Sequence, residues 1–590
     1  MKPSNPHTLL SRLKSRLADQ RTYYWVFLVV LLVPNLFLCF TEPLPLLGRV
    51  ALIVVPGAVW MALLTLSRRP GIPIWCMLPL LVFGAFQLVL LYLFGNSIIA
   101  VDMLLNVATT NSGEALELLG KLVPAIAGVI LLYVPTLILG VMSIRIADRL
   151  TPEFRRRNRL RAGALFLVGV ATIFGARMQD PAYRVKLDIW PANIAYNLQL
   201  AVERWDQSEH YAETSRDFRF EATTEHADSV REVYILVVGE TSRALNWQLY
   251  GYDRETTPRL IRHTDHMVWF RDMLTQANAT HKSVPIMMSA ASAENFNTLY
   301  TQKSILTAFK EAGFQTAFFS NQLPNRSFID YFGEEADTTV FLKANRMAKG
   351  EDYNPYDNVL LESVDPLLAD TTLRKLFIVL HTYGSHFDYQ ERYPVNDIYF
   401  RPASYESVGF KNRDILVNAY DNSIRATDKL LDGIIARLQA LPHTASAMLY
   451  ASDHGEDLYD DRRKLFLHAS PIPSYYQLHI PCLIWFSPRY DTLWPQAHAQ
   501  AAANSTKPVT TNVIFHTLLD LGGVDTPYRN DSLAVTSPRF TVTPRHYLND
   551  HNRPETLDQV GFKAQDIEMF HRLGLDYPTP QKDTSSRKSK

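Results

Sequence analysis

Long apolar runs, separated by short polar connections, fill most of the first 176 residues of the chain. A helix needs about 20 mostly apolar residues to cross a lipid bilayer. Five runs approach that length, at 23–41, 47–66, 74–95, 122–144 and 160–176. The fifth is the shortest and has Arg161 at its edge. The pattern therefore predicts a membrane α-helical domain with five transmembrane helices over residues 1–176.

The hydrophobic pattern changes after about residue 231. Short apolar runs with the length of buried strands alternate there with stretches of helical periodicity. The strand-like runs lie at 232–238, 315–320, 375–381, 446–452 and 480–486, and two clear helical stretches at 304–312 and 413–441. This alternation is typical of an α/β fold with a mostly parallel sheet.

The remaining stretches complete the predicted organisation. Residues 177–230 contain amphipathic pieces such as "WPANIAYNLQLAVERW" and predict a linker that bridges the two domains along the membrane surface. Residues 231–577 hold the α/β pattern. Residues 578–590 are polar and poor in apolar side chains, which predicts a disordered tail.

Basic residues between the apolar runs predict the orientation of the chain, because cytoplasmic loops of membrane proteins carry an excess of Lys and Arg. The N-terminal tail is basic, Arg68 and Arg69 follow the second run, and seven arginines lie within 145–161. The connections at 42–46 and 96–120 are poor in Lys and Arg. Five spans from a cytoplasmic N-terminus place the α/β part outside, which is the periplasm in a bacterium with two membranes.

The distribution of charge and the number of cysteines exclude some partners and some covalent links. The formal net charge of the 590 residues is zero, but residues 1–161 carry 16 Lys and Arg against 7 Asp and Glu, and the rest 43 against 52. A net-acidic α/β part argues against nucleic acid as a partner. Cys482 is the one cysteine of that part, so it holds no internal disulfide.

Metal-binding residue types follow three of the strand-like runs. Glu240 follows the first run, His381 and His386 end the third, and "SDHGED" after the fourth contains Asp453, His454 and Asp457. The carboxyl ends of parallel strands meet at one edge of a sheet. Acidic and imidazole groups gathered there favour a divalent metal ion. The alternative for each motif alone is an acidic, solvated turn.

Thr280 is a candidate nucleophile because it precedes a plausible helix. The backbone N–H groups of a helix N-terminus favour a phosphate attached to that hydroxyl. The alternative is an ordinary N-cap threonine. Thr241 also carries a hydroxyl near the predicted metal, but in an extended segment its side chain would point away from that of Glu240. His468, in "LFLHASPIP", is a further candidate, although a lone histidine is more often structural.

The connection at 96–120 contains three polar residues at helical spacing. Asn106, Thr110 and Glu114 stand at i, i+4 and i+8, so they would share one face of a helix at the outer membrane boundary. Spacing alone favours an ordinary polar face.

These motifs resemble the membrane phosphoethanolamine transferases of Gram-negative bacteria, in the alkaline phosphatase and sulfatase superfamily. "VVGETSRALNWQLYGYDRETTP" is similar to the family's segment after the first sheet strand, and "SDHGED" to its metal-binding motif. The resemblance implies a five-span membrane domain and a periplasmic α/β alkaline phosphatase-like (sulfatase) domain. It implies catalytic roles for Thr280, His386 and His468, a metal set of Glu240, Thr280, Asp453 and His454, and substrate binding by Asn106, Thr110 and Glu114.

The resemblance also implies an activity and its partners. The expected enzyme sits in the cell inner membrane and uses one or two Zn²⁺ ions. It transfers phosphoethanolamine from phosphatidylethanolamine, among the membrane lipids, to lipopolysaccharide or a periplasmic glucan through a covalent threonine intermediate. The absence of disulfides departs from the lipid A-modifying members and is closer to members that modify the lipopolysaccharide core or glucans. The alternatives are a phosphoglycerol transferase that uses phosphatidylglycerol, and an inactive envelope scaffold. A sulfatase is disfavoured because no cysteine stands in the required motif.

Overall fold

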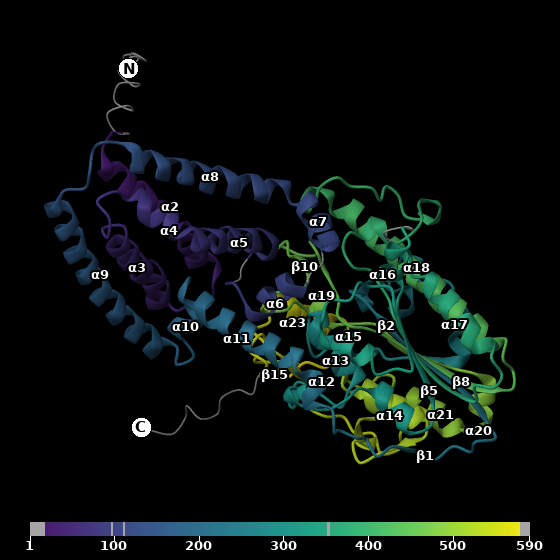
Figure 1. Ribbon diagram of the computed structural model, residues 1–590. Coiled ribbons are helices and arrows are strands. Elements are labelled where there is room, and N and C mark those ends of the chain that lie inside the picture. The colour runs from purple at the N-terminus through teal and green to yellow at the C-terminus, as the bar shows by residue number, and fades with distance from the viewer. Residues whose placement is uncertain (1–17, 96–97, 110–111, 351–354, 579–590) are drawn as a thin grey trace, which may run out of the picture. The chain divides into compact units, whose positions relative to one another are not determined.

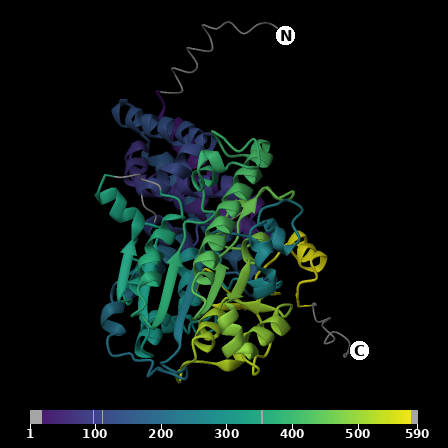
Figure 2. The ribbon, with the colours of Figure 1, turned by 90° about the vertical axis from the view of Figure 1, so that its right-hand side faces the viewer.

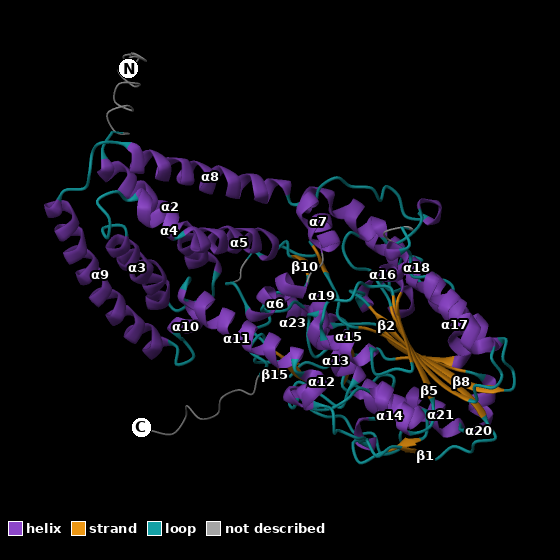
Figure 3. Ribbon diagram, in the orientation of Figure 1, coloured by secondary structure: helices purple, strands orange, loops and turns teal. Residues whose placement is uncertain are grey.

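The computed structural model describes residues 18–95, 98–109, 112–350 and 355–578. The chain divides into two compact units. The first comprises residues 1–104 and 119–202, and the second residues 105–118 and 203–590. Among the described residues, every strand lies in the second unit, as the orange segments of Figure 3 show.

The first unit is built from apolar helices. Four of them are long and apolar enough to cross a membrane: α2 (Gln20–Thr41), α3 (Leu46–Leu63), α8 (Val123–Arg145) and α9 (Pro152–Gln179). The third predicted span is divided at Met77 into α4 (Gly71–Cys76) and α5 (Leu78–Phe94). At 1.5 Å per residue, the 17 residues of α5 reach about 26 Å, slightly less than the hydrocarbon core of a bilayer.

The fifth predicted span begins earlier than the apolar run suggests. Helix α9 starts at Pro152, and the Thr151 side chain caps it by accepting from the Phe154 N–H. The arginine-rich stretch before residue 162 therefore belongs to the helix and not to a loop. Arg155 and Arg159 donate to the carbonyl oxygen of Thr65 at 2.8 and 2.9 Å, which ties this end of α9 to the end of α3.

Further helices complete the described residues before the sheet. They are α6 (Val101–Thr109), α7 (Ser112–Lys121), α10 (Val185–Asp188), α11 (Ala192–Glu209) and α12 (Tyr211–Thr214), of which α11 is the longest. The predicted amphipathic stretch of the linker forms α11, and the division between the two units falls within it, after Val202.

A seven-stranded sheet organises the second unit, in the order β3-β11-β8-β2-β7-β5-β6. Strands β8 (Thr444–Ser452), β2 (Arg231–Gly239), β7 (Lys375–His381), β5 (Gln315–Ser320) and β6 (Thr338–Phe341) run parallel. Strands β11 (Cys482–Phe486) and β3 (Met267–Trp269) extend it in antiparallel fashion. The predicted mostly parallel sheet is confirmed, and Figure 2 shows its strands side by side.

Helices cover both faces of this sheet (Figure 1). Alternate residues of β2, including Leu236 and Val238, share one core with α13 (Thr280–Met288), α14 (Ile305–Glu311) and α22 (Val513–Leu521). Helices α17 (Val359–Ala369) and α18 (Arg413–Gln439) pack together on the opposite side. Because β2 and β7 are buried on both faces, their sequences read as continuous apolar runs, and the equally buried β8 has a shorter run at 447–451.

Smaller elements flank this core. The helices are α15 (Phe328–Gly333), α16 (Leu342–Ala348), α19 (Tyr475–Leu478), α20 (Pro488–Leu493), α21 (Pro495–Asn504) and α23 (Ala564–Arg572). The short strands are β1 (Thr223–Thr224), β4 (Met273–Leu274), β9 (Asp457–Leu458), β10 (Phe466–Leu467), β12 (Val509–Thr510), β13 (Val524–Asp525), β14 (His546–Leu548) and β15 (Pro554–Thr556).

Candidate metal centre

Neighbouring parallel strands bring the predicted metal ligands to one edge of the sheet. Strand β2 pairs with β7 on one side and with β8 on the other, and Gly239 lies opposite Ser452. Glu240 is the first residue after β2, and Asp453 is the first residue after β8. The Asp453 N–H donates to the Gly239 carbonyl oxygen at 3.0 Å, so the two loops leave the sheet together.

Glu240, Asp453 and His454 form a compact, buried cluster. One ligand atom of each lies within 4.8 Å of the others. The Nε2 atom of His454 is 3.1 Å from Asp453 Oδ2 and 3.6 Å from Glu240 Oε1, and the three residues are at most 1% exposed. Two carboxylates and one imidazole in this arrangement are a suitable donor set for Zn²⁺.

The electrostatics of the cluster also fit a cation. Burial and the neighbouring Asp453 carboxylate raise the pKa of Glu240 to about 8. Burial raises the pKa of Asp453 to about 7 and lowers the pKa of His454 to about 4. A divalent ion would favour both carboxylates in their charged form and would bind the neutral imidazole.

The orientation of His454 directs one ring nitrogen into the cluster. Its Nδ1 atom is 3.0 Å from the carbonyl oxygen of Gly455, which can only accept, so Nδ1 carries the proton. The lone pair of Nε2 then faces Glu240, Asp453 and the Thr280 hydroxyl. A backbone carbonyl that fixes the imidazole in this way is usual for histidine ligands of metals.

Thr280 places its hydroxyl beside the same cluster. It is the first residue of α13, as the sequence predicts for a threonine at a helix start. Its Oγ1 atom is 3.1 Å from His454 Nε2 and 3.4 Å from Glu240 Oε1. The residue as a whole is only partly buried, unlike Glu240, Asp453 and His454.

Thr241 does not point away from the cluster, and the expectation based on an extended segment is wrong. The residue has a φ angle of 58°, in the left-handed region, so side-chain alternation ends there. Its Oγ1 donates to Glu240 Oε1 at 2.6 Å, and its backbone N–H donates to Asp453 Oδ1 at 2.9 Å. Thr241 therefore orients two members of the cluster.

His386 and His468 lie around the cluster. The ring centre of His468 is 4.1 Å from that of His454 and 6.1 Å from that of His386. His386 Nδ1 contacts the Phe387 carbonyl oxygen at 2.6 Å, and His468 Nδ1 contacts Glu456 Oε2 at 2.8 Å. Burial lowers the pKa of His468 to about 4 and the pKa of His386 well below its ordinary value.

His381 and Asp457, which also follow strand-like runs, lie outside this arrangement. His381 Nδ1 is 3.0 Å from the Ser320 hydroxyl. Asp457 accepts from the Ser474 hydroxyl and the Gln477 amide. Neither residue belongs to the metal-binding group found among the described residues.

Two residues of the site escape the sequence reasoning. Gln322 Nε2 donates to Glu240 Oε2 at 3.1 Å and to the Thr382 carbonyl oxygen at 2.8 Å. Glu456 contacts His468 and also accepts from the Tyr389 hydroxyl at 2.8 Å. Both carried an available signal, because Gln322 follows the end of β5 and Glu456 is part of "SDHGED".

Gly384 allows the loop after β7 to approach the cluster. It has a φ angle of 54°, and a Cβ atom placed on it would lie 2.6 Å from the Glu240 carbonyl oxygen. A side chain at this position would push the loop that carries His386 away from Glu240. The glycine is therefore required by both backbone conformation and space.

The polar residues of the outer connection are only partly described. Asn106 lies in α6 and Glu114 in α7. Thr110 and the side chain of Glu114 lie outside the described residues, so their shared face stays a prediction. Residues 105–118 belong to the same compact unit as the sheet.

Comparisons with known proteins agree with this geometry. Residues 232–524 match the model of the Sulfatase family. The phosphoethanolamine transferase EptC of Escherichia coli K12 is 27% identical over 333 residues, which cover 55% of this chain and 56% of EptC. The match thus spans little more than half the length of that relative.

Two solved structures share the fold. The integral membrane lipooligosaccharide phosphoethanolamine transferase EptA of Neisseria meningitidis has a TM-score of 0.70 at 22% identity, over 86% of this chain and 97% of that one. The C-terminal periplasmic domain of Escherichia coli EptC, crystallised in complex with Zn, has a TM-score of 0.52 at 24% identity, over 58% and 97%. The fold class predicted from the sequence, apolar N-terminal helices followed by an alkaline phosphatase-like α/β domain, is confirmed. Residues 232–524 therefore resemble a sulfatase-family domain, and the similar proteins are named phosphoethanolamine transferases, the family whose motifs the sequence resembles.

Proposed function

We propose that the protein transfers phosphoethanolamine from phosphatidylethanolamine to a lipopolysaccharide or glucan acceptor of the cell envelope. One observation carries the proposal: the Thr280 hydroxyl lies 3.1 Å from His454 Nε2, at the edge of a buried cluster suited to a metal ion. Relatives named as phosphoethanolamine transferases support this choice of reaction. The acceptor class follows from the family resemblance and from the absence of disulfides.

We assign Zn²⁺ as the cofactor, with Glu240, Asp453, His454 and Thr280 as the residues that would hold it. The buried carboxylates, the His454 Nε2 lone pair that faces them and the zinc complex of the EptC domain support this assignment. When bound, Zn²⁺ supplies charge that favours a deprotonated hydroxyl and stabilises negative charge on phosphoryl oxygens.

Thr280 is the nucleophile of the first half-reaction. Its Oγ1 forms a bond to the phosphorus of phosphatidylethanolamine, and the bond from phosphorus to the glycerol oxygen breaks. The hydroxyl proton passes to a neutral imidazole, and an imidazole returns a proton to the departing glycerol oxygen. Diacylglycerol leaves, and phosphoethanolamine stays on Thr280. The low pKa values of His386 and His468 provide the neutral imidazoles that this exchange needs.

The acceptor reverses this chemistry in the second half-reaction. An acceptor oxygen forms the new bond to phosphorus, and the bond to Thr280 Oγ1 breaks. The proton of the acceptor is released, and Thr280 regains one. Because Nδ1 of His386 and of His468 is already engaged, each ring would donate from Nε2 to a phosphoryl oxygen only after it has taken up a proton.

The location of the reaction is part of the proposal. Residues 1–176 would span the inner membrane, and the catalytic domain of residues 231–577 would lie in the periplasm. Residues 177–230 would connect these two domains. Asn106, Thr110 and Glu114, in the outer connection, would bind the donor head group. A C-terminal alkaline phosphatase fusion is expected to be active and a green fluorescent protein fusion dark, and the reverse pattern would contradict this topology.

Lipid turnover by variants tests the reaction. The purified full chain with zinc, phosphatidylethanolamine and lipopolysaccharide is expected to release diacylglycerol and to add phosphoethanolamine to the acceptor. Thr280→Ala is expected to abolish both products without loss of folded protein, whereas the exposed Thr301→Ala serves as the matched control. Activity with phosphatidylglycerol instead would favour phosphoglycerol transfer, and full activity of Thr280→Ala would refute the assignment of the nucleophile.

A further inference from the structure

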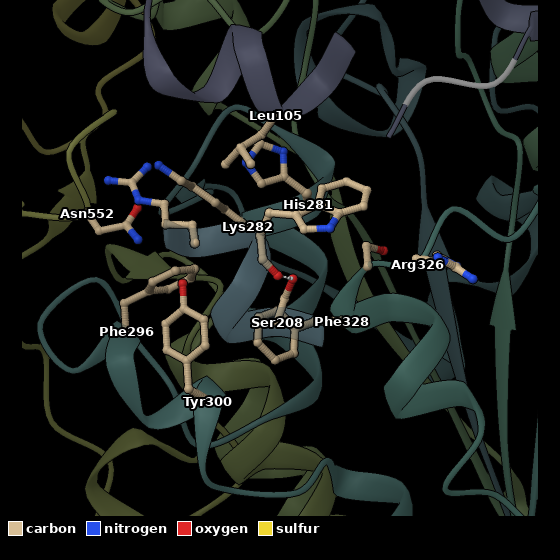
Figure 4. A pocket seen from close by; sticks show the side chains of 12 residues that line it. Leu105, Ser208, His281, Lys282, Phe296, Tyr300, Arg326, Phe328 and Asn552 are labelled. Carbon is tan, nitrogen blue, oxygen red and sulfur yellow. Dashed lines mark hydrogen bonds between the residues drawn. The ribbon is translucent and has the colours of Figure 1, made fainter. Parts of the chain in front are cut away.

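A small cavity lies beside the first turn of α13. It has a volume of about 60 Å³, and His281 and Lys282, the two residues after Thr280, contribute to its lining (Figure 4). Successive side chains of a helix point about 100° apart. The cavity is therefore next to the nucleophile but on another side of the helix from the hydroxyl of Thr280.

Aromatic side chains make up much of the cavity wall. Trp205 comes from α11, Phe296 and Tyr300 from the 3₁₀ helix at Phe296–Tyr300, and Phe328 from α15. In Figure 4 the rings of Phe296 and Tyr300 lie next to one another below Lys282. Aromatic faces are the surfaces against which the C–H groups of a sugar ring pack, and a few polar groups then fix its orientation.

Cationic groups stand on the same wall. Lys282 is 2% exposed, and its Nζ donates to the Asn549 carbonyl oxygen at 3.0 Å. Arg204 Nη1 donates to the carbonyl oxygen of Asp550, the next residue, at 2.8 Å. The ammonium and the guanidinium group are therefore held along the same short stretch of backbone. Together they form a site suited to a phosphate.

We propose that this cavity holds a phosphorylated sugar of the acceptor during the second half-reaction. The cationic groups disfavour the ethanolammonium group of the donor, because like charges repel. A cavity of about 60 Å³ is small, so we expect it to admit the phosphate while the sugar ring packs against the aromatic side chains and the rest of the glycan extends outward. This proposal rests on the function proposed above and adds the residues that select the acceptor.

The two half-reactions can be measured separately, which makes a direct test possible. The full chain with zinc and phosphatidylethanolamine, but without acceptor, should release one burst of diacylglycerol. Glucose 1-phosphate, glucose and inorganic phosphate are then added to the loaded protein, and the loss of the adduct is followed. We expect glucose 1-phosphate to discharge the adduct faster than glucose or inorganic phosphate.

Variants of the cavity should affect only the second half-reaction. Trp205→Ala and Arg204→Gln are expected to keep the burst within about twofold of the wild type and to slow discharge by glucose 1-phosphate at least tenfold. Arg219→Gln is the matched control, because Arg219 is exposed and also donates to backbone carbonyls. An equal loss of burst and discharge would mean that the cavity serves the donor or the fold, and unchanged discharge would also refute the proposal. Discharge by inorganic phosphate as fast as by glucose 1-phosphate would refute the role of the aromatic wall.

The absence of any burst in the wild type would refute the proposed function itself. In that case, calorimetry can still measure whether glucose 1-phosphate binds to the full chain, which tests the cavity independently of the reaction. Binding that is lost in Trp205→Ala and Arg204→Gln supports the site, and binding that persists in both contradicts it.

A second, independent observation concerns Glu117 in α7. Its Oε2 accepts from Arg392 Nη2 at 2.8 Å and from the Asp388 N–H at 3.2 Å. The guanidinium carbon of Arg392 lies 3.9 Å from the ring centre of Tyr383, and that ring stacks on His386 at 5.4 Å. Arg392 is buried, so its guanidinium group relies on protein partners and not on water for its hydrogen bonds.

We infer that Glu117 is a positioning residue for His386 and acts through Arg392 and Tyr383. This inference also rests on the proposed function. Without the carboxylate, a buried guanidinium would lose a charged partner and would move. The stacked Tyr383 and His386 rings would then shift relative to Thr280.

Variants that remove or exchange the charges of Glu117 and Arg392 can distinguish a role in positioning His386 from a role in general stability. Glu117→Gln is expected to lower the rate constant of the diacylglycerol burst at least tenfold while zinc content, melting temperature and the KM for the donor stay near those of the wild type. The double variant Glu117→Arg, Arg392→Glu is expected to recover part of the rate. Glu362→Gln, which removes an exposed ion pair with Arg346, is the control. A normal burst in Glu117→Gln, a loss that parallels the melting temperature, or no recovery in the double variant would contradict the inference.

Discussion

Replacing Glu240 with glutamine should make the metal-free protein less sensitive to pH while it weakens zinc binding. Burial and Asp453 raise the pKa of Glu240 from its ordinary value of 4.5 to about 8. Below about pH 4 this group is protonated in the folded and the unfolded chain. As the pH rises from 4.5 to 8, the unfolded chain releases the proton before the folded chain does. Stability therefore falls with rising pH over this window.

The structure sets the size of the effect. One pKa unit corresponds to about 1.4 kcal/mol, so the shift from 4.5 to about 8 gives an upper bound of roughly 5 kcal/mol for Glu240. At roughly 2 °C per kcal/mol, this bound corresponds to about 10 °C in melting temperature. Asp453, whose pKa is raised to about 7, adds to the same trend. Glutamine is neutral at every pH and removes the contribution of Glu240.

Thermal unfolding of the full chain in detergent micelles tests this prediction. With a chelator, the melting temperature of the wild type should fall between pH 5 and pH 8, and that of Glu240→Gln should fall clearly less. Zinc at pH 8 should stabilise the wild type by several degrees and the variant little. Glu362→Gln, far from the cluster in sequence and exposed, should follow the wild type. Identical pH profiles, or equal stabilisation by zinc, would refute the reasoning.

Three further substitutions test separate features of the site. Gly384→Ala should destabilise the protein by about 1–3 kcal/mol and lower its activity, because the added Cβ would lie 2.6 Å from the Glu240 backbone and the φ angle is positive. A melting temperature equal to that of the wild type would contradict this. Thr241→Val should weaken zinc affinity about 10–100-fold, because it removes the 2.6 Å hydrogen bond to Glu240. Competition with a chelator measures this affinity, and an unchanged value would show that the hydrogen bond is dispensable. Glu456→Gln should lower turnover about tenfold at saturating zinc, because His468 loses its carboxylate partner, and turnover like the wild type would exclude that role.

Buried strands and their ends were predictable from the sequence for a physical reason. Strands β2, β7 and β8 are buried on both faces, so β2 and β7 appear as unbroken apolar runs and β8 as a shorter run at 447–451. The residues after β2 and β8 could then be assigned to one edge of the sheet. Strands β3 and β6 have three and four residues, too few for a recognisable pattern, and they were not predicted.

Features that depend on contacts distant in sequence could not be predicted. Glu117 and Arg392 are separated by 275 residues, and their ion pair follows from the tertiary fold alone. The left-handed conformation of Thr241 has no sequence signal, because a threonine rarely adopts it without support from its surroundings. The division of the third apolar run at Met77, by contrast, has a local signal, because Pro79 lies in the first turn of α5 and has no N–H with which to continue the helix from α4.

Peptide mapping can show whether Thr280 carries phosphoethanolamine between donor and acceptor, as we propose. The full chain with zinc is incubated with phosphatidylethanolamine in the absence of acceptor, digested, and examined by mass spectrometry. We expect a phosphoethanolamine adduct on the peptide that contains Thr280, and we expect it to disappear when acceptor is added. An adduct on Thr241 instead, or diacylglycerol release by the wild type without any adduct on Thr280, would contradict it.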